Sequence, residues 1–271
     1  MKYSILTAVH NGERFIDSYF ETVFSQTICP DEIILIDDKL NPYNFEEIIE
    51  KKKIKYNFKN IFLIKNNKNL GPCISLNKGI SFTKNKLILR LDFDDQWKRE
   101  HAEYMINCYK KDSSYLFYFN IIELNNLKKK IKYDKFFINE NFSIHSSWLI
   151  NLNICKNFRY YLKNPIIALE DYFTISYYTR KGFKFFVTEK NTVLYNDHLM
   201  GHGKLTKKNS VKEFYRKRIA KSLFSYYSRL YFKNSKLSKF FFILKNFGIL
   251  KYLVFVLWTI DYLNLRKFIR G

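Results

Sequence analysis

Three carboxylates gather within four positions, at Asp92, Asp94 and Asp95, and they follow an apolar run that only Arg90 interrupts. Two unit charges about 5 Å apart repel by about 3 kcal/mol at an effective dielectric of about 20, so such a cluster needs a compensating cation. Mg²⁺ and Mn²⁺ fit, because they bind one or two carboxylates and share phosphate oxygens with a substrate. Two plainer interpretations are solvated loop acids, and acids stabilised by the dipole of a helix that begins near Arg99.

The elements that must position this cluster alternate regularly in the first half of the chain. Short, continuous apolar runs predict buried strands, and the amphipathic stretches between them predict helices. The expected strands are residues 3–9, 32–37, 60–65 and 86–92, and the expected helices are residues 14–27, 44–56 and 71–83. Units of roughly 30 residues that alternate in this way predict right-handed βαβ crossovers and a parallel sheet covered on both faces.

Polar residues follow each of the four expected strands. They lie at residues 10–12, 37–38, 66–71 and 92–95. Because the carboxyl ends of parallel strands share one edge of a sheet, and ligands bind at that edge, the four clusters predict a single ligand site.

The pattern is looser after residue 98. We expect a helix at residues 99–112, two strands within residues 115–137 around a turn near Asn126, and a helix at residues 168–182 that ends at Gly182. One or two further strands are expected within residues 183–198.

The net charge of +22 is concentrated at the C-terminus, where residues 204–271 hold 17 Lys and Arg against two acids. Two or three basic, aromatic helices are expected from residue 210, and their pattern favours an anionic membrane surface over the alternative of helices packed on the domain with a solvated basic face. No apolar run reaches the roughly 20 residues of a membrane span. The four isolated cysteines match no zinc pattern, so they predict reduced core thiols in a cytoplasmic protein.

Five motifs, taken in order, resemble family 2 glycosyltransferases with the GT-A fold. They are "ILTAVHNGERF" at the first strand, "DEIILIDD", "NLGPCISLNKG", "LRLDFDD" and the pair Glu170-Asp171, over roughly residues 2–200. The resemblance implies an α/β GT-A fold with a Rossmann-like, mostly parallel sheet flanked by helices, and a C-terminal helical extension. It implies a catalytic domain at residues 1–205, with a nucleotide-sugar half at about 1–98 and an acceptor half at about 99–205, followed by the basic amphipathic region 206–271.

The resemblance also implies chemical roles. Asp171 matches the general base that deprotonates the acceptor hydroxyl, with Glu170 as the second choice and an ordinary acidic helical turn as the alternative. Asp94 matches the acid nearest a Mn²⁺ or Mg²⁺ ion, Asp92 lies beside it, and His198 resembles a late metal or diphosphate ligand, although a plain surface or core His is favoured there.

Nucleotide-sugar binding is implied for a further set of positions. These are Ala8, His10, Asn11, Asp38, Asn69, Arg90 and Asp92. Ala8 stands where the family commonly has Pro, and Asp38 continues into "KLNPYN" instead of Gly-Ser, so the base contacts depart from the family pattern. His145 is a weaker candidate for the acceptor site.

The function implied is inverting transfer of a hexose or N-acetylhexosamine from a UDP-sugar to a glycan or lipid-linked glycan acceptor. The pathway implied is lipopolysaccharide, lipooligosaccharide or capsule biosynthesis, at the inner face of the cell membrane. A nucleic-acid-binding protein is one alternative, supported by the basic C-terminal region, but acids at the ligand edge would repel phosphates without a metal, so nucleic acid is not expected as a partner. A nucleotidyltransferase is a second alternative, but such an enzyme would need a Gly-rich, basic phosphate-binding loop where this chain has "HNGER".

Overall fold

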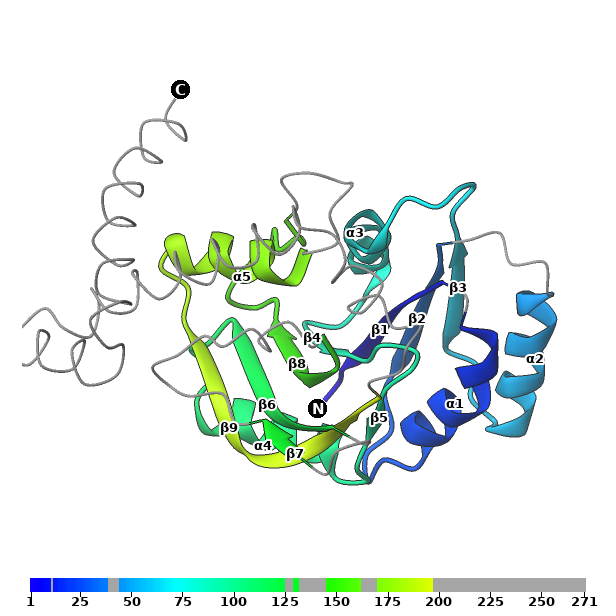
Figure 1. The fold of residues 1–271 in the computed structure, drawn as a ribbon, viewed down its shortest axis with the longest axis horizontal. Coiled ribbons are helices and arrows are strands. Elements are labelled where there is room, and N and C mark those ends of the chain that lie inside the picture. The colour runs from blue at the N-terminus through cyan, green and yellow to red at the C-terminus, as the bar shows by residue number, and fades with distance from the viewer. Residues whose placement is uncertain (11, 39–43, 125–128, 132–144, 162–169, 197–271) are drawn as a thin grey trace, which may run out of the picture.

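A nine-stranded sheet forms the centre of the part of the chain that the computed structural model describes, which is residues 1–10, 12–38, 44–124, 129–131, 145–161 and 170–196 (Figure 1). The strand order is β3-β2-β1-β4-β8-β6-β9-β5, and β7 pairs with β6. In chain order the elements are β1 (Ser4–Val9), η1 (Glu13–Phe15), α1 (Ile16–Phe24), β2 (Glu32–Asp37), α2 (Phe45–Lys55), β3 (Ile61–Lys65), α3 (Pro72–Phe82), β4 (Leu87–Arg90), β5 (Gln96–Trp97), α4 (His101–Lys111), β6 (Phe117–Leu124), β7 (Lys129–Ile131), η2 (His145–Ser147), β8 (Trp148–Asn151), α5 (Glu170–Arg180) and β9 (Phe185–Tyr195).

The first four strands form the predicted parallel half of the sheet. β1 lies between β2 and β4, and Val9 pairs with Asp37 while Leu6 pairs with Arg90. The carboxyl ends of β1, β2 and β4 therefore reach the same edge, as the sequence predicts. The second half adds antiparallel pairings of β8 with β4 and β6, and of β5 with β9, so the sheet as a whole is mixed.

Two apolar layers cover the faces of the sheet. Neighbouring strand residues such as Ile5 and Leu6 point to opposite faces. Ile5 packs in the layer with α1, α2 and α4, whereas Leu6 packs in the layer with α3 and α5. In Figure 1, α3 and α5 lie in the upper part of the view, whereas α1 and α2 lie at the lower right and right. Strands buried on both faces explain why their sequences are continuous apolar runs.

Local signals set the helix ends. The Asn44 side chain accepts a hydrogen bond from the Glu47 N–H at 3.2 Å and caps α2, as its position predicts. Gly71 has a φ of 81° immediately before Pro72 begins α3, and Gly182 has a φ of 88° just after α5 ends. Both backbones are left-handed, which favours glycine.

Some predictions need correction. The four cysteines have free thiols, but Cys29 is exposed and only Cys73 is fully buried, so the expectation of four core residues is wrong. The short strands β5 and β8 were not predicted, because pairing with distant strands defines them. No helix in the described residues combines the length and apolarity that crossing a bilayer requires. Asn11, His198 and the C-terminal region 206–271, with its expected helices, lie outside the described residues.

Candidate active site

The three clustered carboxylates occupy different environments. Asp95 is buried; its Oδ2 accepts a 2.6 Å hydrogen bond from Ser146 Oγ, and its Oδ1 accepts one from the Asn196 N–H at 3.0 Å. Burial, followed by the charges of Asp94 and Asp92, raises the pKa of Asp95 well above its usual range, and the two hydrogen bonds oppose that shift. Asp92 and Asp94 are only half-buried. Asp95 is therefore structural, and the other two acids can face a ligand.

Arg90 supplies a cation from within the protein. Its side chain is 1% exposed, and its guanidinium donates to the Leu6 carbonyl and, at 2.7 Å, to Asp92 Oδ1. A buried guanidinium needs such partners, because an unpaired charge in the interior is strongly unfavourable. The compensating cation that the carboxylates require is thus partly built into β4. Contact of Arg90 with a phosphate stays a prediction.

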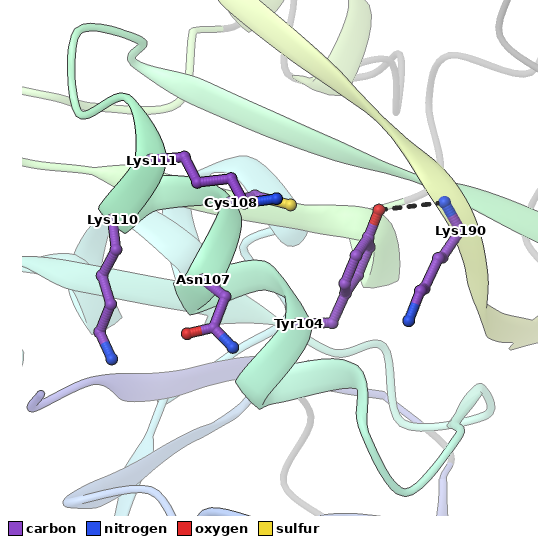
Figure 2. A pocket seen from close by; sticks show the side chains of 6 residues that line it. All are labelled: Tyr104, Asn107, Cys108, Lys110, Lys111 and Lys190. Atoms are coloured by element: carbon purple, nitrogen blue, oxygen red, sulfur yellow. Dashed lines mark hydrogen bonds between the residues drawn. The ribbon is translucent and has the colours of Figure 1, made fainter.

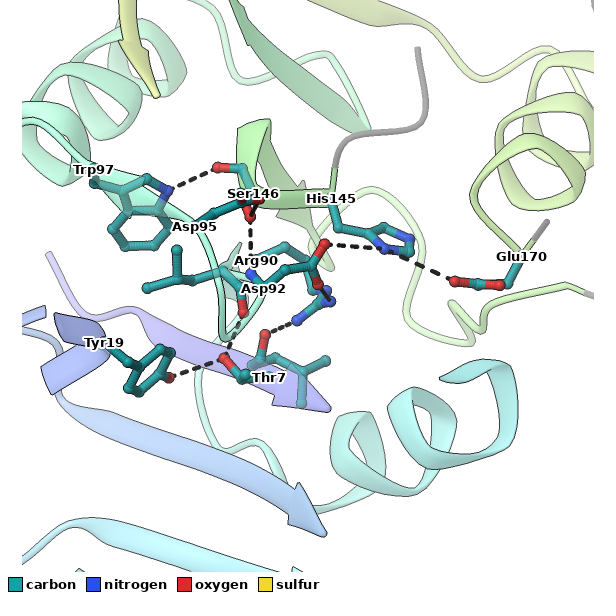
Figure 3. A network of polar contacts seen from close by, with 11 residues as sticks. Thr7, Tyr19, Arg90, Asp92, Asp95, Trp97, His145, Ser146 and Glu170 are labelled. Carbon is teal, nitrogen blue, oxygen red and sulfur yellow. Dashed lines mark hydrogen bonds and ion pairs between the residues drawn. The ribbon is translucent and has the colours of Figure 1, made fainter. Parts of the chain in front are cut away.

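Side chains of β1 and α1 hold the turn that carries these acids. Thr7 Oγ1 donates to the Leu91 carbonyl at 2.7 Å and lies 2.9 Å from the Tyr19 hydroxyl (Figure 3). The Tyr19 ring stacks on Phe93 at a centroid distance of 4.7 Å. A Cβ at Gly12 would lie 2.5 Å from the Phe93 ring, so the "HNG" turn requires glycine for this close approach.

Ser146 joins this turn to the second half of the chain. Its hydroxyl accepts from the Asp92 N–H at 2.8 Å while it donates to Asp95, and its carbonyl accepts from Trp97 Nε1 at 2.7 Å. Ser146 was not predicted as a site residue. The short polar segment "IHSSW" is its only signal in the sequence, and nothing in that segment indicates a contact with the acids.

His145 lies between the acids of the two halves. Its Nδ1 is 3.9 Å from Asp92 Oδ2 and 3.9 Å from Glu170 Oε1, in the first turn of α5 (Figure 3). Burial lowers the pKa of His145 to about 3, so the imidazole is neutral near pH 7. The ring packs edge-on against Trp148 and Tyr160, at centroid distances of 4.8 and 5.5 Å.

The predicted catalytic pair begins α5. Glu170 and Asp171 are both buried, at 7% and 9% exposure. The structure brings Glu170 to the Asp92 end of β4 through His145, and Asp171 follows it in the same helical turn. The role of Asp171 as a base stays a prediction.

A second polar group surrounds Asp38 at the end of β2. Asp38 Oδ1 accepts from Asn66 Nδ2 at 2.9 Å, from the Leu70 N–H at 2.9 Å and from Ser75 Oγ at 2.7 Å. Asn69 is exposed, and its Oδ1 accepts from the Gly71 N–H at 3.0 Å. Two of the predicted polar clusters therefore meet here. Asp38 fixes the turn that leads into α3, and its proposed contact with the nucleotide base is untested.

The remaining predicted donor positions lie at the end of β1. His10 is exposed, which leaves its ring accessible to a ligand, and Ala8 is half-buried in the strand beside Ile36. Their roles in nucleotide-sugar binding stay predictions.

Two surface hollows lie apart from these groups. One is lined by Tyr104, Asn107, Cys108, Lys110, Lys111 and Lys190, with the Lys190 N–H donating to the Tyr104 hydroxyl at 3.1 Å (Figure 2). The other includes Arg159, Tyr161 and Tyr177 at the C-terminal end of α5. Neither hollow contains a predicted site residue.

The donor set at β4 fits a hard divalent cation. Partly exposed carboxylates such as Asp92 and Asp94 are the ligands that Mg²⁺ and Mn²⁺ prefer. Within the described residues, His, Cys, Asp and Glu side chains form no group of three that could hold a metal by themselves.

Comparison with known proteins places the chain in a family. The model of glycosyl transferase family 2 matches residues 4–186. The chain is 29% identical, over 182 residues, to an uncharacterized glycosyltransferase of Methanocaldococcus jannaschii, covering 62% of this chain and 61% of that protein. It is 31% identical over 134 residues to the cholesterol galactosyltransferase of Borreliella burgdorferi, covering 48% of this chain and 36% of the other. It is 26% identical over 113 residues to the Escherichia coli UDP-Gal:alpha-D-GlcNAc-diphosphoundecaprenol beta-1,3-galactosyltransferase, covering 41% of this chain and 40% of the other.

Solved structures share the fold. Staphylococcus aureus TarS (residues 1–349) in complex with UDP-GlcNAc superposes with a TM-score of 0.64 at 18% identity, covering 82% of this chain and 66% of that one. The mannosyltransferase PcManGT of Pyrobaculum calidifontis, in complex with GDP-Man and Mn²⁺, gives a TM-score of 0.59 at 10% identity, covering 87% and 65%. At these identities the likeness establishes the GT-A fold alone.

The fold is therefore that of the GT-A glycosyltransferases, with the acids at the carboxyl edge of its parallel strands. The chain belongs to glycosyl transferase family 2, and its residues 4–186 form a glycosyltransferase domain. The chain spans about six tenths of the length of the M. jannaschii relative, and 36% and 40% of the other two. Neither alternative function gains support from these comparisons.

Proposed function

We propose that the protein transfers a hexose or N-acetylhexosamine from a UDP-sugar to a glycan acceptor, with inversion at the anomeric carbon. One observation carries the proposal: Asp92 and Glu170, far apart in the sequence, face the same His145 nitrogen at 3.9 Å each. An acid of the donor half and an acid of the acceptor half thus line one site, as a sugar transfer between two bound substrates requires.

The chemistry follows from the residues present. The acceptor oxygen attacks the anomeric carbon, the bond from that carbon to the diphosphate oxygen breaks, and UDP leaves with the electron pair. Asp171 takes the proton of the acceptor hydroxyl as general base. Asp94 and Asp92 would hold a Mg²⁺ or Mn²⁺ ion, and stabilising the charge of the leaving diphosphate is what such an ion contributes when bound. The Arg90 guanidinium keeps the Asp92 carboxylate oriented through its hydrogen bond to Oδ1.

The names of the relatives support the substrate classes. Two relatives are named as galactosyltransferases, and TarS was solved with UDP-GlcNAc, which supports a UDP-sugar donor. The PcManGT complex contains Mn²⁺, which supports use of a divalent ion. The names of two relatives contain a lipid, cholesterol in one and GlcNAc-diphosphoundecaprenol in the other, which supports a lipid-linked acceptor. The pathway that we propose is lipopolysaccharide, lipooligosaccharide or capsule biosynthesis.

UDP release tests the reaction. Wild-type protein is incubated with a panel of UDP-sugars, with and without Mn²⁺, and compared with Asp94→Ala and Asp171→Asn. We expect slow, metal-dependent UDP release from one donor, its loss in Asp94→Ala, and retained UDP binding with lost transfer in Asp171→Asn. Asp112→Ala is the matched control, since this exposed acid lies at the end of α4, away from the site. If no donor releases UDP and calorimetry detects no UDP binding with Mn²⁺, the proposal is wrong.

The basic C-terminal region gives the proposal a membrane component. Its 17 Lys and Arg between residues 204 and 271 would each add about 1 kcal/mol at an anionic bilayer surface, before screening by salt. We therefore expect the full chain to sediment with vesicles whose anionic lipid gives them the surface charge of a cytoplasmic membrane face. Added salt should release the protein from these vesicles. Equal binding to neutral vesicles, or none to either, would contradict this part.

A further inference from the structure

The His145 side chain occupies an unusual position between two acids. Its Nδ1 is 3.9 Å from Asp92 Oδ2 and 3.9 Å from Glu170 Oε1, and both distances exceed the roughly 3.2 Å limit of an N–H···O hydrogen bond. Neither bond is formed, and each is less than about 1 Å from forming. A single N–H can make only one strong hydrogen bond at a time.

The His145 ring is held while the Asp92 carboxylate can adjust. Trp148 and Tyr160 pack edge-on against the ring, and the following residue, Ser146, is tied to the Asp92 backbone N–H. Asp92 Oδ1 is bound by Arg90, Oδ2 lies 3.9 Å from His145 Nδ1, and the side chain is 34% exposed, so Oδ2 has room to turn toward a ligand. The shared oxygen is therefore Oδ2.

The surroundings define the tautomer of the imidazole. A lone pair on Nδ1 would point at two acidic oxygens, so Nδ1 carries the proton. Nε2 is buried and has no hydrogen-bond partner among the described residues, in agreement with that assignment. His145 therefore presents one N–H group midway between Asp92 and Glu170.

We propose that His145 is a positioning residue that gives its one hydrogen bond to Glu170 when the sugar donor binds. This inference rests on the proposed function, because it assumes that Asp92 Oδ2 turns toward the divalent ion that would accompany the donor diphosphate. Once Oδ2 turns to the donor, the Nδ1–H of His145 is left to Glu170 and fixes the first turn of α5. Asp171, the next residue of that turn, is then held for the acceptor hydroxyl. Donor binding thus prepares the base.

Kinetics of two substitutions test the hydrogen bond. His145→Asn keeps a donor, because the Asn amide nitrogen can occupy the position of Nδ1, whereas His145→Leu keeps similar bulk without any donor. We expect His145→Leu to lower kcat for transfer by about 10–100-fold, the usual effect of removing a residue that orients a site, with KM for the donor within about twofold. His145→Asn should recover most of the turnover.

His101→Asn is the matched control. His101 is a second buried histidine; unlike that of His145, its Nδ1 is hydrogen-bonded, 2.8 Å from Thr192 Oγ1, which is not a site acid. Near wild-type transfer is expected for it. Equal loss in His145→Asn and His145→Leu would show that only the ring volume matters, and a raised donor KM with unchanged kcat would place His145 in donor binding. Either result overturns the inference.

Nuclear magnetic resonance gives a readout that needs no activity. In protein with ¹⁵N-labelled histidine, the signals that disappear in His145→Asn should be those of a neutral ring protonated at Nδ1, and UDP with Mg²⁺ should shift them. A ring protonated at Nε2 would overturn the inference even if the enzyme is active. If wild-type protein transfers no sugar from any UDP-sugar, the proposed function fails. The tautomer still decides whether the Nδ1 of His145 carries the proton and can donate the hydrogen bond described here.

Discussion

Asp38 offers a direct test of how the carboxyl edge of the sheet is built. Its Oδ1 accepts from Asn66 Nδ2, the Leu70 N–H and Ser75 Oγ, at 2.9, 2.9 and 2.7 Å. These three donors belong to the turn after β3 and to α3, so one oxygen ties two elements to the end of β2. We expect Asp38→Ala to destabilise the protein and to release this turn.

The magnitude follows from the donors left without an acceptor. Asn66 Nδ2 keeps its 2.8 Å bond to Ser75 Oγ, so the Leu70 N–H and the Ser75 hydroxyl suffer most. Each unsatisfied buried donor costs about 1–3 kcal/mol, which gives about 3 kcal/mol for Asp38→Ala and a fall in Tm of about 6–12 °C. Asp38→Asn keeps an acceptor oxygen but loses the charge, so about 1 kcal/mol is expected.

Urea denaturation of both variants, with a double-mutant cycle to Ser75→Ala, measures these values. The cycle should give a coupling of about 1–2 kcal/mol between Asp38 and Ser75, because each substitution removes the same bond. Asp112→Ala, which removes one exposed 2.9 Å bond to the Ser114 N–H, should change the free energy of unfolding by less than about 1 kcal/mol. If Asp38→Ala unfolds at the wild-type urea concentration while losing UDP binding, Asp38 serves the ligand and the structural reasoning is refuted.

Three further predictions follow from particular contacts. Gly79→Ala should lower the urea midpoint by overpacking, at a cost of about 1–3 kcal/mol, since its Cβ would lie 2.4 Å from Leu6 Cδ1; an unchanged midpoint would show that α3 can shift. Asp92→Asn should destabilise by about 2–3 kcal/mol and Arg90→Met by less, because the first leaves the fully buried guanidinium without its counter-charge whereas the second leaves only a partly exposed carboxylate; equal effects would contradict this asymmetry. Burial lowers the pKa of His101 to about 3, whereas its pKa in the unfolded chain is about 6.5, so the unfolded state binds the proton first as the pH falls. The free energy of unfolding should therefore fall by up to about 1.4 kcal/mol per pH unit from about pH 6.5 down to about 3. Urea unfolding at about pH 7 and 5 should show a smaller fall in His101→Asn than in the wild type.

The first half of the fold could be predicted because its signals are local. Strands β1, β2 and β4 are buried on both faces, and all four strands read as continuous apolar runs; Asn44, Pro72 and Gly182 mark helix ends through short-range chemistry. β5 and β8 have two and four residues and exist through pairing with β9, β4 and β6. No local pattern could define elements that depend on partners so far along the chain.

The same limit applies to the site. By spacing alone Asp92, Asp94 and Asp95 are equivalent, because all three follow one apolar run; only the family resemblance assigns metal roles to Asp94 and Asp92. The structure separates them through Ser146, which comes from the other half of the chain and binds Asp95 Oδ2 at 2.6 Å. Which acid is structural depends on that long-range contact. Spacing alone predicts the location of the cluster but not the division of roles within it.

This division also changes what a metal must do. The sequence indicates three acids in need of an outside cation, but Arg90 already holds Asp92 Oδ1, and both oxygens of Asp95 accept hydrogen bonds inside the protein. Because only part of the cluster can turn to a ligand, the chain by itself should hold Mn²⁺ weakly, and diphosphate oxygens must complete the coordination. Titration of Mn²⁺ followed by electron paramagnetic resonance should therefore show affinity that rises at least about tenfold when UDP is present, and by reciprocity UDP should bind about tenfold more tightly with Mn²⁺. Tight Mn²⁺ binding that UDP does not change would mean that the carboxylates form a complete metal site, and the separation of Asp95 from Asp92 and Asp94 would then be wrong.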